Sequence, residues 1–488
     1  MQDFQIMETT IALVHRAMLD GNLTTRQLIS SYIDRIKAYD ELFRSIILIN
    51  PKALEEAERL DQHLKENGKL IGPLHGIPVM LKDNVDTKDM ITTAGSASLE
   101  DNQPAEDAFI TKKLLEAGAI ILAKTNLHEF AIWGETISSI LGQSVNPYDF
   151  TRTPGGSSGG TGAAIAANFG LVGIGTDTIN SVRSPSSACS LVGIRPTIGL
   201  VSRGGIIPYS LTQDTAGPIC RTVEDAVKTL DVIAGYDPAD PVTAKSVKNR
   251  PTSYLAHLKK DGLQGKRIGV LRSFFGKKEE NLEVSRVVES ALPYLEEGGA
   301  ELISIDREID SDWIVREVSV HLDDFKTHLG LYLEKLPANY PIHSLEDVLA
   351  SGKYHPGVED NMKTAIGLDV GTAEYNEKLL RQEDLRIEIL QIMAENDLDA
   401  MVYPHQQQLV CKIGSGQKQR NGALCSATGF PSIAVPAGFV PDENAPIGVP
   451  VGMEIMGRPF SEPVLIEIAY AFEQLSGLRK PPVSAERF

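Results

Sequence analysis

The stretch TPGGSSGGTGAAIAANFGLVGIG, residues 153–175, joins a glycine- and serine-rich run directly to apolar sequence. Glycine and serine at this density usually form a flexible linker. A structureless linker, however, is not followed at once by an alanine-rich helical turn and a short apolar strand. The context therefore argues against a linker and asks what else uses these residues.

Two other interpretations of this run fail on their own requirements. A phosphate-binding loop of the G-x-x-x-x-G-K-[ST] type needs a lysine that the run lacks. The pattern G-x-S-x-G is present around both Ser157 and Ser158, as in the nucleophile elbow of α/β-hydrolases. That elbow must follow a strand, whereas residues 146–154 read as a polar loop.

Composition limits the class of protein. The chain has 488 residues, 42% hydrophobic and 23% charged, which is typical of a globular protein with a large core. Its net charge of −18 disfavours binding to a phosphate backbone, so no nucleic-acid partner is expected. The acidic start does not resemble a signal peptide, and the longest weakly polar run, residues 162–175, is too short to cross a bilayer. We therefore expect no membrane partner.

Cysteine and histidine spacing gives two further expectations. The four cysteines lie far apart without a C-x-x-C pair, which suits reduced thiols in a cytoplasmic protein. The ten histidines show no H-E-x-x-H or similar pairing. No metal and no cofactor are therefore expected.

Helical and strand patterns alternate along most of the chain. This alternation predicts α/β layers around a largely buried sheet. Helices are predicted at residues 5–20, 25–38, 52–67, 107–117, 222–234, 283–297, 384–396 and 462–475, and strands at 77–81, 119–123, 266–271, 301–305, 399–403, 432–436 and 451–455. Residues 236–253 read as a polar connection, and 310–380 as charged helix with glycine and proline breaks.

Several motifs, in order, resemble the amidase signature family. They are GIPVMLKDN at 76–84, GGSSGG at 155–160, GTDTINSVR at 175–183, VGIRPT at 192–197, PSIAVPAG at 431–438 and MGRPF at 456–460. The resemblance is clear over residues 10–235 and 385–478 and thin between them. It implies one large α/β/α layered domain over residues 1–488 around a central mixed, mostly parallel sheet. Within it, 1–68 form N-terminal helices, 69–235 the signature core, 236–384 a variable, mainly helical segment and 385–488 the C-terminal part of the core.

The resemblance also implies a catalytic triad. Ser181 falls on the family's nucleophile, Ser157 on its serine in a cis peptide, and Lys82 on its base. A serine hydroxyl becomes an effective nucleophile when a base removes its proton, and a neutral lysine can receive that proton through a second serine. Burial would lower the pKa of Lys82 as this role requires, provided that Asp83 and Asp86 point away from the amine.

The residues around Ser181 are expected to form the oxyanion hole and part of the substrate site. These residues are Thr178, Ile179 and Asn180, together with Ser158. The family most often has Gly-Gly before the nucleophile, whereas this chain has Ile179-Asn180, a difference that bears on the hole geometry and the acyl pocket. Asp177 and Arg183 are expected to brace the loop, with an ordinary surface ion pair as the alternative.

The resemblance favours a hydrolase that cleaves a carboxylic amide through a Ser181 acyl-enzyme and releases ammonia or an amine. A glutaminase subunit of a tRNA-dependent amidotransferase is the alternative, and a non-catalytic binding relative a further one. The partner would be a small-molecule amide whose identity the sequence does not give, and assembly as a homodimer is left open.

Overall fold

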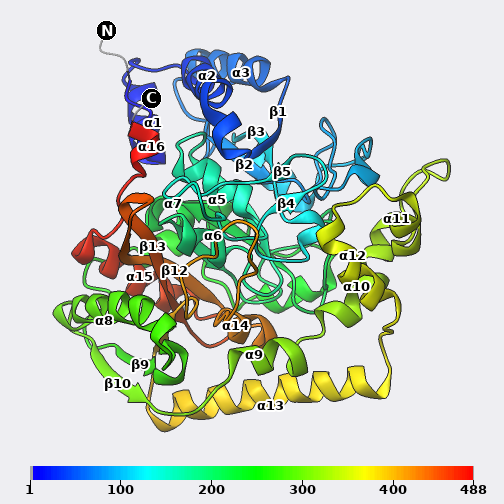
Figure 1. Ribbon diagram of the computed structural model, residues 1–488. Helices are drawn as coiled ribbons and strands as arrows, with labels where there is room; N and C mark the ends of the chain where they lie inside the picture. The colour runs from blue at the N-terminus through cyan, green and yellow to red at the C-terminus, as the bar shows by residue number, and fades with distance from the viewer. Residues whose placement is uncertain (1–3, 487–488) are drawn as a thin grey trace.

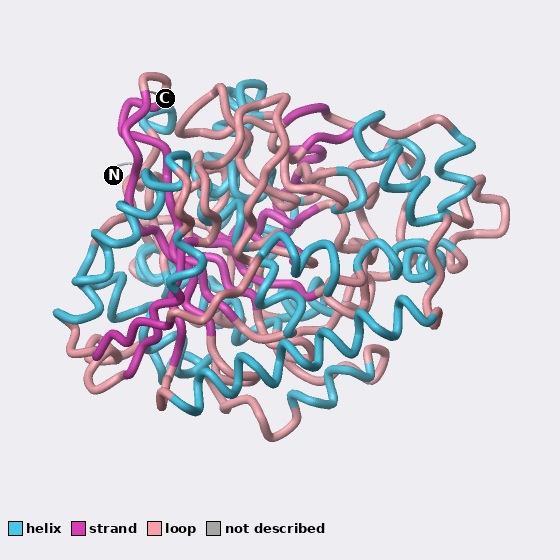
Figure 2. The backbone as a smooth tube through the Cα atoms, turned by 60° about the horizontal axis from the view of Figure 1, so that its bottom comes forward, coloured by secondary structure: helices cyan, strands magenta, loops and turns pink. Residues whose placement is uncertain are grey.

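The computed structural model describes residues 4–486 and contains one large sheet covered by helices (Figures 1 and 2). The strands are β1 Ile46–Ile49, β2 Pro78–Lys82, β3 Ile120–Thr125, β4 Ile137–Ser138, β5 Gly142–Gln143, β6 Val172–Asp177, β7 Val192–Arg195, β8 Thr215–Cys220, β9 Arg267–Leu271, β10 Glu301–Ile305, β11 Ala400–Pro404, β12 Ser432–Asp442 and β13 Ala445–Met456. The α-helices are α1 Ile11–Leu19, α2 Thr25–Phe43, α3 Ala53–Asn67, α4 Phe109–Glu116, α5 Gly159–Ala166, α6 Arg183–Ala188, α7 Val223–Ile233, α8 Leu282–Glu297, α9 Ser311–Trp313, α10 His321–Leu333, α11 Leu345–Ser351, α12 Glu359–Ile366, α13 Ala373–Glu395, α14 Ala423–Thr428, α15 Glu462–Ser476 and α16 Val483–Glu486.

Eleven strands form the main sheet of the described residues, in the order β1-β3-β2-β6-β8-β7-β12-β13-β11-β9-β10. The α/β class and the mixed sheet are confirmed, but the prediction of a mostly parallel sheet is wrong. Four neighbouring pairs are parallel and six are antiparallel. The cause is local: β12 and β13 form a long hairpin, and β8 returns between β6 and β7 antiparallel to both.

Most predicted elements are found, with shifted ends. Helix α13 is much longer than predicted, because it begins after Thr372, whose hydroxyl caps its first turn. Strand β8 has no predicted counterpart. Its sequence, TAGPIC, contains a glycine and a proline, which normally argue against a central strand.

Helices pack on both faces of the sheet. One row consists of α4, α7, α15 and α8, and the other face carries α5 and α6. Two smaller apolar clusters lie beside the main core. One joins Ile179 to residues of α13, α14 and β11, and the other joins α10, α11 and α12 to the loops around Phe130 and Tyr209. In Figure 1 α10 to α12 form a lobe at the right, with α13 running below.

Two further observations concern the described residues. None of their helices is long and apolar enough to cross a membrane. All four cysteines are unpaired, and three of them are buried.

Candidate active site

Lys82 is the last residue of β2, which pairs with β3 on one side and β6 on the other. The residue is completely buried. Its Nζ donates hydrogen bonds to Ser157 Oγ at 2.7 Å and to Thr176 Oγ1 at 2.8 Å. The end of one strand therefore delivers a buried amine directly to the glycine- and serine-rich loop.

Burial lowers the pKa of Lys82 to about 7, against the opposing fields of Asp177 and Asp214. The two acidic residues that follow it in the sequence point elsewhere. Asp83 pairs with Lys124 at 3.1 Å, and Asp86 accepts a hydrogen bond from the Tyr332 hydroxyl at 2.9 Å. Near neutral pH a large fraction of Lys82 is therefore uncharged and able to accept a proton.

Ser157 lies in the loop between Pro154 and α5, and the Gly156–Ser157 peptide bond is cis. The side chain of Ser157 is buried, and its carbonyl oxygen accepts a hydrogen bond from the backbone N–H of His128 at 3.0 Å. The glycines of this loop are needed for close approach. A Cβ at Gly156 would lie 2.6 Å from Thr136 Oγ1, and one at Gly162 would lie 2.8 Å from Pro185 Cβ. The unusual composition thus belongs to a packed, buried loop.

Ser158 fastens this loop to its neighbours. Its backbone N–H donates to the Ser181 carbonyl at 3.3 Å, and its hydroxyl donates to the Thr176 carbonyl at 3.1 Å. The side chain is completely buried. Its contacts are those of a brace that ties the loop to the end of β6, rather than of a group facing a substrate.

Ser181 occupies the turn between β6 and α6 and keeps 5% of its surface exposed. In the part of the chain that the structure describes, its hydroxyl makes no hydrogen bond. The backbone N–H groups of Thr178, Ile179, Asn180 and Ser181 likewise have no acceptor there. Four free N–H groups in one turn are the donors that an oxyanion hole requires.

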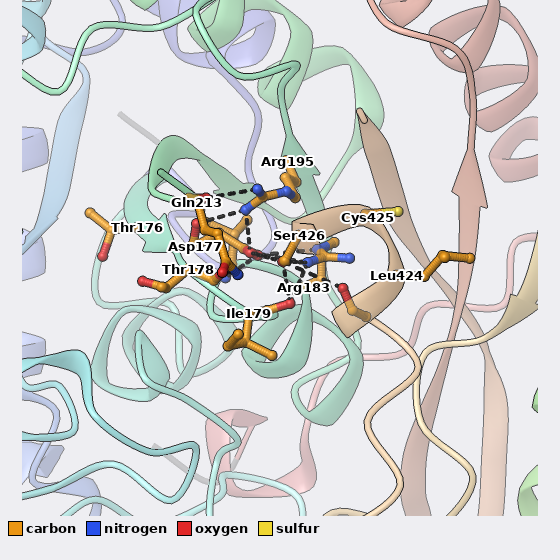
Figure 3. Close-up of polar contacts among 12 residues, drawn as sticks. Thr176, Asp177, Thr178, Ile179, Arg183, Arg195, Gln213, Leu424, Cys425 and Ser426 are labelled. Atoms are coloured by element: carbon orange, nitrogen blue, oxygen red, sulfur yellow. Dashed lines mark hydrogen bonds and ion pairs between the residues drawn. The ribbon is translucent and has the colours of Figure 1, made fainter. Parts of the chain in front are cut away.

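A buried charge network holds this turn from behind (Figure 3). Asp177 Oδ1 pairs with Arg183 Nη2 at 3.0 Å and with Arg195 Nη1 at 2.7 Å, and Arg183 Nη1 pairs with Glu454 at 2.8 Å. All four side chains are completely buried. Burial alone would raise the pKa of Asp177, but the two guanidinium groups hold it well below its usual range. The expected bracing pair is thus part of an internal network, not a surface ion pair.

The network also orients the peptide groups before Ser181. The Ile179 carbonyl accepts hydrogen bonds from Arg183 Nη2 at 2.8 Å and from Ser426 Oγ at 2.5 Å. With this carbonyl directed into the network, the neighbouring N–H groups are left free. The orientation comes from fixed partners and does not depend on Gly-Gly at 179–180.

The two residues that depart from the family's usual Gly-Gly are both buried. Ile179 is 7% exposed and belongs to the apolar cluster that also contains Leu424 and Ile314. Asn180 is 2% exposed, and its Nδ2 has no partner among the described residues. The side chain of Ile179 therefore packs in the interior instead of projecting freely into a substrate site.

Four residues at this site were not singled out in the sequence. Thr176 holds Lys82, His128 holds the Ser157 carbonyl, and Arg195 and Glu454 complete the network. Thr176 and Arg195 lie within the quoted motifs, and this position was the only available signal. Glu454 comes from β13, 271 residues after its partner Arg183, and nothing in the local sequence marks it. No group of three or more metal-ligating side chains occurs within residues 4–486.

Comparisons with known proteins agree with this geometry. The family model described as "Amidase" matches residues 27–466, including the middle segment in which the motifs are thin. A probable amidase of Arabidopsis thaliana is 36% identical, covering 98% of this chain and 92% of its own. A glutamyl-tRNA(Gln) amidotransferase subunit of a Synechococcus strain is 32% identical, covering 97% and 94%. Among solved structures, native peptide amidase from Stenotrophomonas maltophilia superposes with a TM-score of 0.88 at 36% identity, covering 98% of each chain.

Proposed function

Because the chain belongs to the amidase signature family, we propose that it is a hydrolase that cleaves a carboxylic amide C–N bond through an acyl-enzyme on Ser181. The observation that carries the proposal is the 2.7 Å hydrogen bond between Lys82 and Ser157. It joins a buried amine, whose pKa is lowered to about 7, to a buried serine beside the turn of Ser181.

The proposed reaction follows from these positions. Neutral Lys82 takes the proton of Ser157 while Ser157 takes that of Ser181, and the Ser181 oxygen attacks the amide carbon. The free N–H groups of residues 178–181 stabilise the negative charge that develops on the carbonyl oxygen. The relay returns a proton to the leaving nitrogen, which departs as ammonia or an amine, and water then hydrolyses the ester on Ser181.

A glutaminase subunit is the second candidate, because the amidotransferase relative covers nearly the whole chain at 32% identity. The higher identity to peptide amidase favours a hydrolase that acts alone. Peptide amides are accordingly the first substrates to test, and ammonia release from free glutamine separates the two candidates. A non-catalytic role is less well supported, since Lys82, Ser157 and Ser181 are all present.

The test is Ser181→Ala, assayed by ammonia release from a panel of peptide, aryl and aliphatic amides. We expect turnover to fall by about three orders of magnitude or more, with the fold retained. Ser290→Ala, on the exposed face of α8, is the matched control and should keep wild-type activity. Mass spectrometry should also find a fluorophosphonate attached to Ser181. Hydrolysis at a tenth of the wild-type rate in Ser181→Ala would exclude this nucleophile.

A further inference from the structure

Arg420 is a half-buried cation close to the candidate active site. Its guanidinium lies over the ring of Trp133, 5.4 Å from the ring centroid. The guanidinium makes no hydrogen bond or ion pair with any of the residues that the structure describes. An arginine in this state has its five N–H donors available to a ligand.

The guanidinium lies next to the loop that carries Ser157. The point at which a Cβ of Gly134 would stand is 3.9 Å from Arg420 Nη1 and 3.8 Å from the carbonyl oxygen of Gly156. Gly156 is the first residue of the cis peptide bond to Ser157. Arg420 and the catalytic loop thus meet across a single glycine.

The chain around Arg420 is anchored at both ends. Asn421 Nδ2 donates to the carbonyls of Phe274 and Pro404, each at 2.8 Å. The Gln417 N–H donates to Glu135 Oε1 at 2.8 Å. The position of Arg420 is therefore set by fixed contacts on either side, as a binding residue requires.

Glu135 lies on the same segment as Trp133 but does not neutralise Arg420. Its second carboxylate oxygen accepts the N–H of Gly134 at 3.0 Å, so both oxygens are already bonded to backbone groups. No ion pair joins it to Arg420 within the described residues. The positive charge beside the loop is left uncompensated.

His128 adds a second donor to this neighbourhood. Burial, then His355 and Arg420, lower its pKa to about 3, so the ring is neutral near pH 7. Its Nδ1 accepts the Glu135 N–H at 3.2 Å, closer than the Glu135 carboxylate at 3.4 Å, which places the ring proton on Nε2. This Nε2 is buried and has no partner in residues 4–486. Donors, rather than acceptors, are therefore free on this side of the site.

We propose that the amide substrate also carries a carboxylate, and that Arg420 binds this carboxylate against the face of Trp133. A guanidinium can hold a carboxylate through two parallel hydrogen bonds, which fixes the orientation of the ligand as well as its charge. The inference rests on the proposed amidase function and narrows its substrate class. Arg420 is a specificity residue that lies outside the Lys82–Ser157–Ser181 relay.

The kinetic test uses N-succinyl-, N-glutaryl- and N-adipoyl-phenylalaninamide, each beside its own methyl ester. The three chain lengths vary the distance between the carboxylate and the reacting amide. For at least one pair, wild-type kcat/KM should be at least about tenfold higher for the acid. In Arg420→Gln the ratio should fall to about one, and in Arg420→Lys it should be intermediate. Arg286→Gln removes one exposed cation from α8 and should keep the wild-type ratio.

A binding test is independent of turnover. The chain has two tryptophans, Trp133 and Trp313, so Trp313→Phe leaves Trp133 as the only indole. In the Ser181→Ala, Trp313→Phe protein, the preferred acid should change the Trp133 fluorescence with a Kd that rises at least about tenfold when Arg420 is changed to Gln.

The two tests separate the site from the reaction. Equal kcat/KM for all three acids and their esters, or a preference that survives Arg420→Gln, would overturn the carboxylate site. Arg420-dependent binding by a wild-type protein that hydrolyses no amide would support the site and reject the proposed reaction. Binding that is indifferent to Arg420 would reject the site even in an active amidase.

Discussion

Two buried lysines near the site show how a single partner decides a residue's chemistry. Lys82 and Lys124 both have no exposed surface. Lys124 lies 3.1 Å from the Asp83 carboxylate, whereas the side chains within hydrogen-bond distance of the Lys82 amine, Ser157 and Thr176, carry no charge. Burial without an adjacent carboxylate favours the neutral amine. Of the two lysines, Lys82 is thus the one suited to act as a base.

The first prediction is the pH dependence that this base imposes. Because Lys82 accepts a proton only when neutral, kcat/KM should rise with pH through a limb near 7 and stay high on the alkaline side. Lys82→Arg cannot become neutral and should lose about three orders of magnitude in kcat/KM. Rates measured from about pH 5 to 10 check both statements. A limb near 10, the region of an ordinary lysine, would argue against the buried amine as the base.

At the scale of elements, glycines bring α5 and α6 together beneath the catalytic turns. Gly162 in α5 faces Pro185 in α6, and an added Cβ would come within 2.8 Å of the Pro185 Cβ. Gly330 in α10 is also helical but has no atom within 4 Å of such a Cβ. The two positions therefore separate the need for close packing from helix propensity.

The corresponding prediction has opposite signs at the two positions. Gly330→Ala should stabilise the protein by about 0.5–1 kcal/mol, because alanine favours the helix. Gly162→Ala gains the same propensity but should destabilise by about 1–3 kcal/mol through overpacking, and should also lower kcat. Thermal and denaturant unfolding measure both effects. A gain in stability at both sites would show that α5 and α6 tolerate a larger separation.

At the scale of the whole molecule, α10, α11 and α12 form a lobe with its own apolar cluster. Phe325 of α10 is fully buried there, and its ring lies 4.8 Å from Tyr209 and 6.2 Å from Phe130. This contact attaches the lobe to the loops beside the site. Fewer contacts bind the lobe to the sheet than bind the sheet's own layers, so it should open locally before the sheet does.

Hydrogen exchange tests this view of the lobe. Phe325→Ala should speed exchange across residues 321–366 while leaving β6 and β8 protected, with about 3–5 kcal/mol lost locally. Leu331→Ala removes an aliphatic side chain from the 48% exposed position on the same helix and should change exchange little. Equal acceleration in β6 and β8 would show that lobe and sheet unfold as one unit.

Much of the site could be read from the sequence because its residues lie in short local motifs. The strand that ends at Lys82, the cis bond before Ser157 and the turn before Ser181 were each expected, and each is found. The catalytic roles assigned to Lys82, Ser157 and Ser181 stay predictions until they are measured. Local sequence was less reliable where it contradicts its surroundings, as in β8, whose proline and glycine are overruled by pairing on both sides.

The sequence by itself determined the α/β class, most of the helices and strands, and the order of the motifs, because hydrophobic periodicity and local spacing encode these features. Only the tertiary structure decided what surrounds Ser181. Glu454 reaches Arg183 from β13, and Ser426 reaches the Ile179 carbonyl from α14. Ile179 joins an interior cluster, and Arg420 comes to lie beside the loop of Ser157. Such partners meet only when distant segments pack, since the energy that selects them comes from burial and charge pairing across the fold, which no local pattern records.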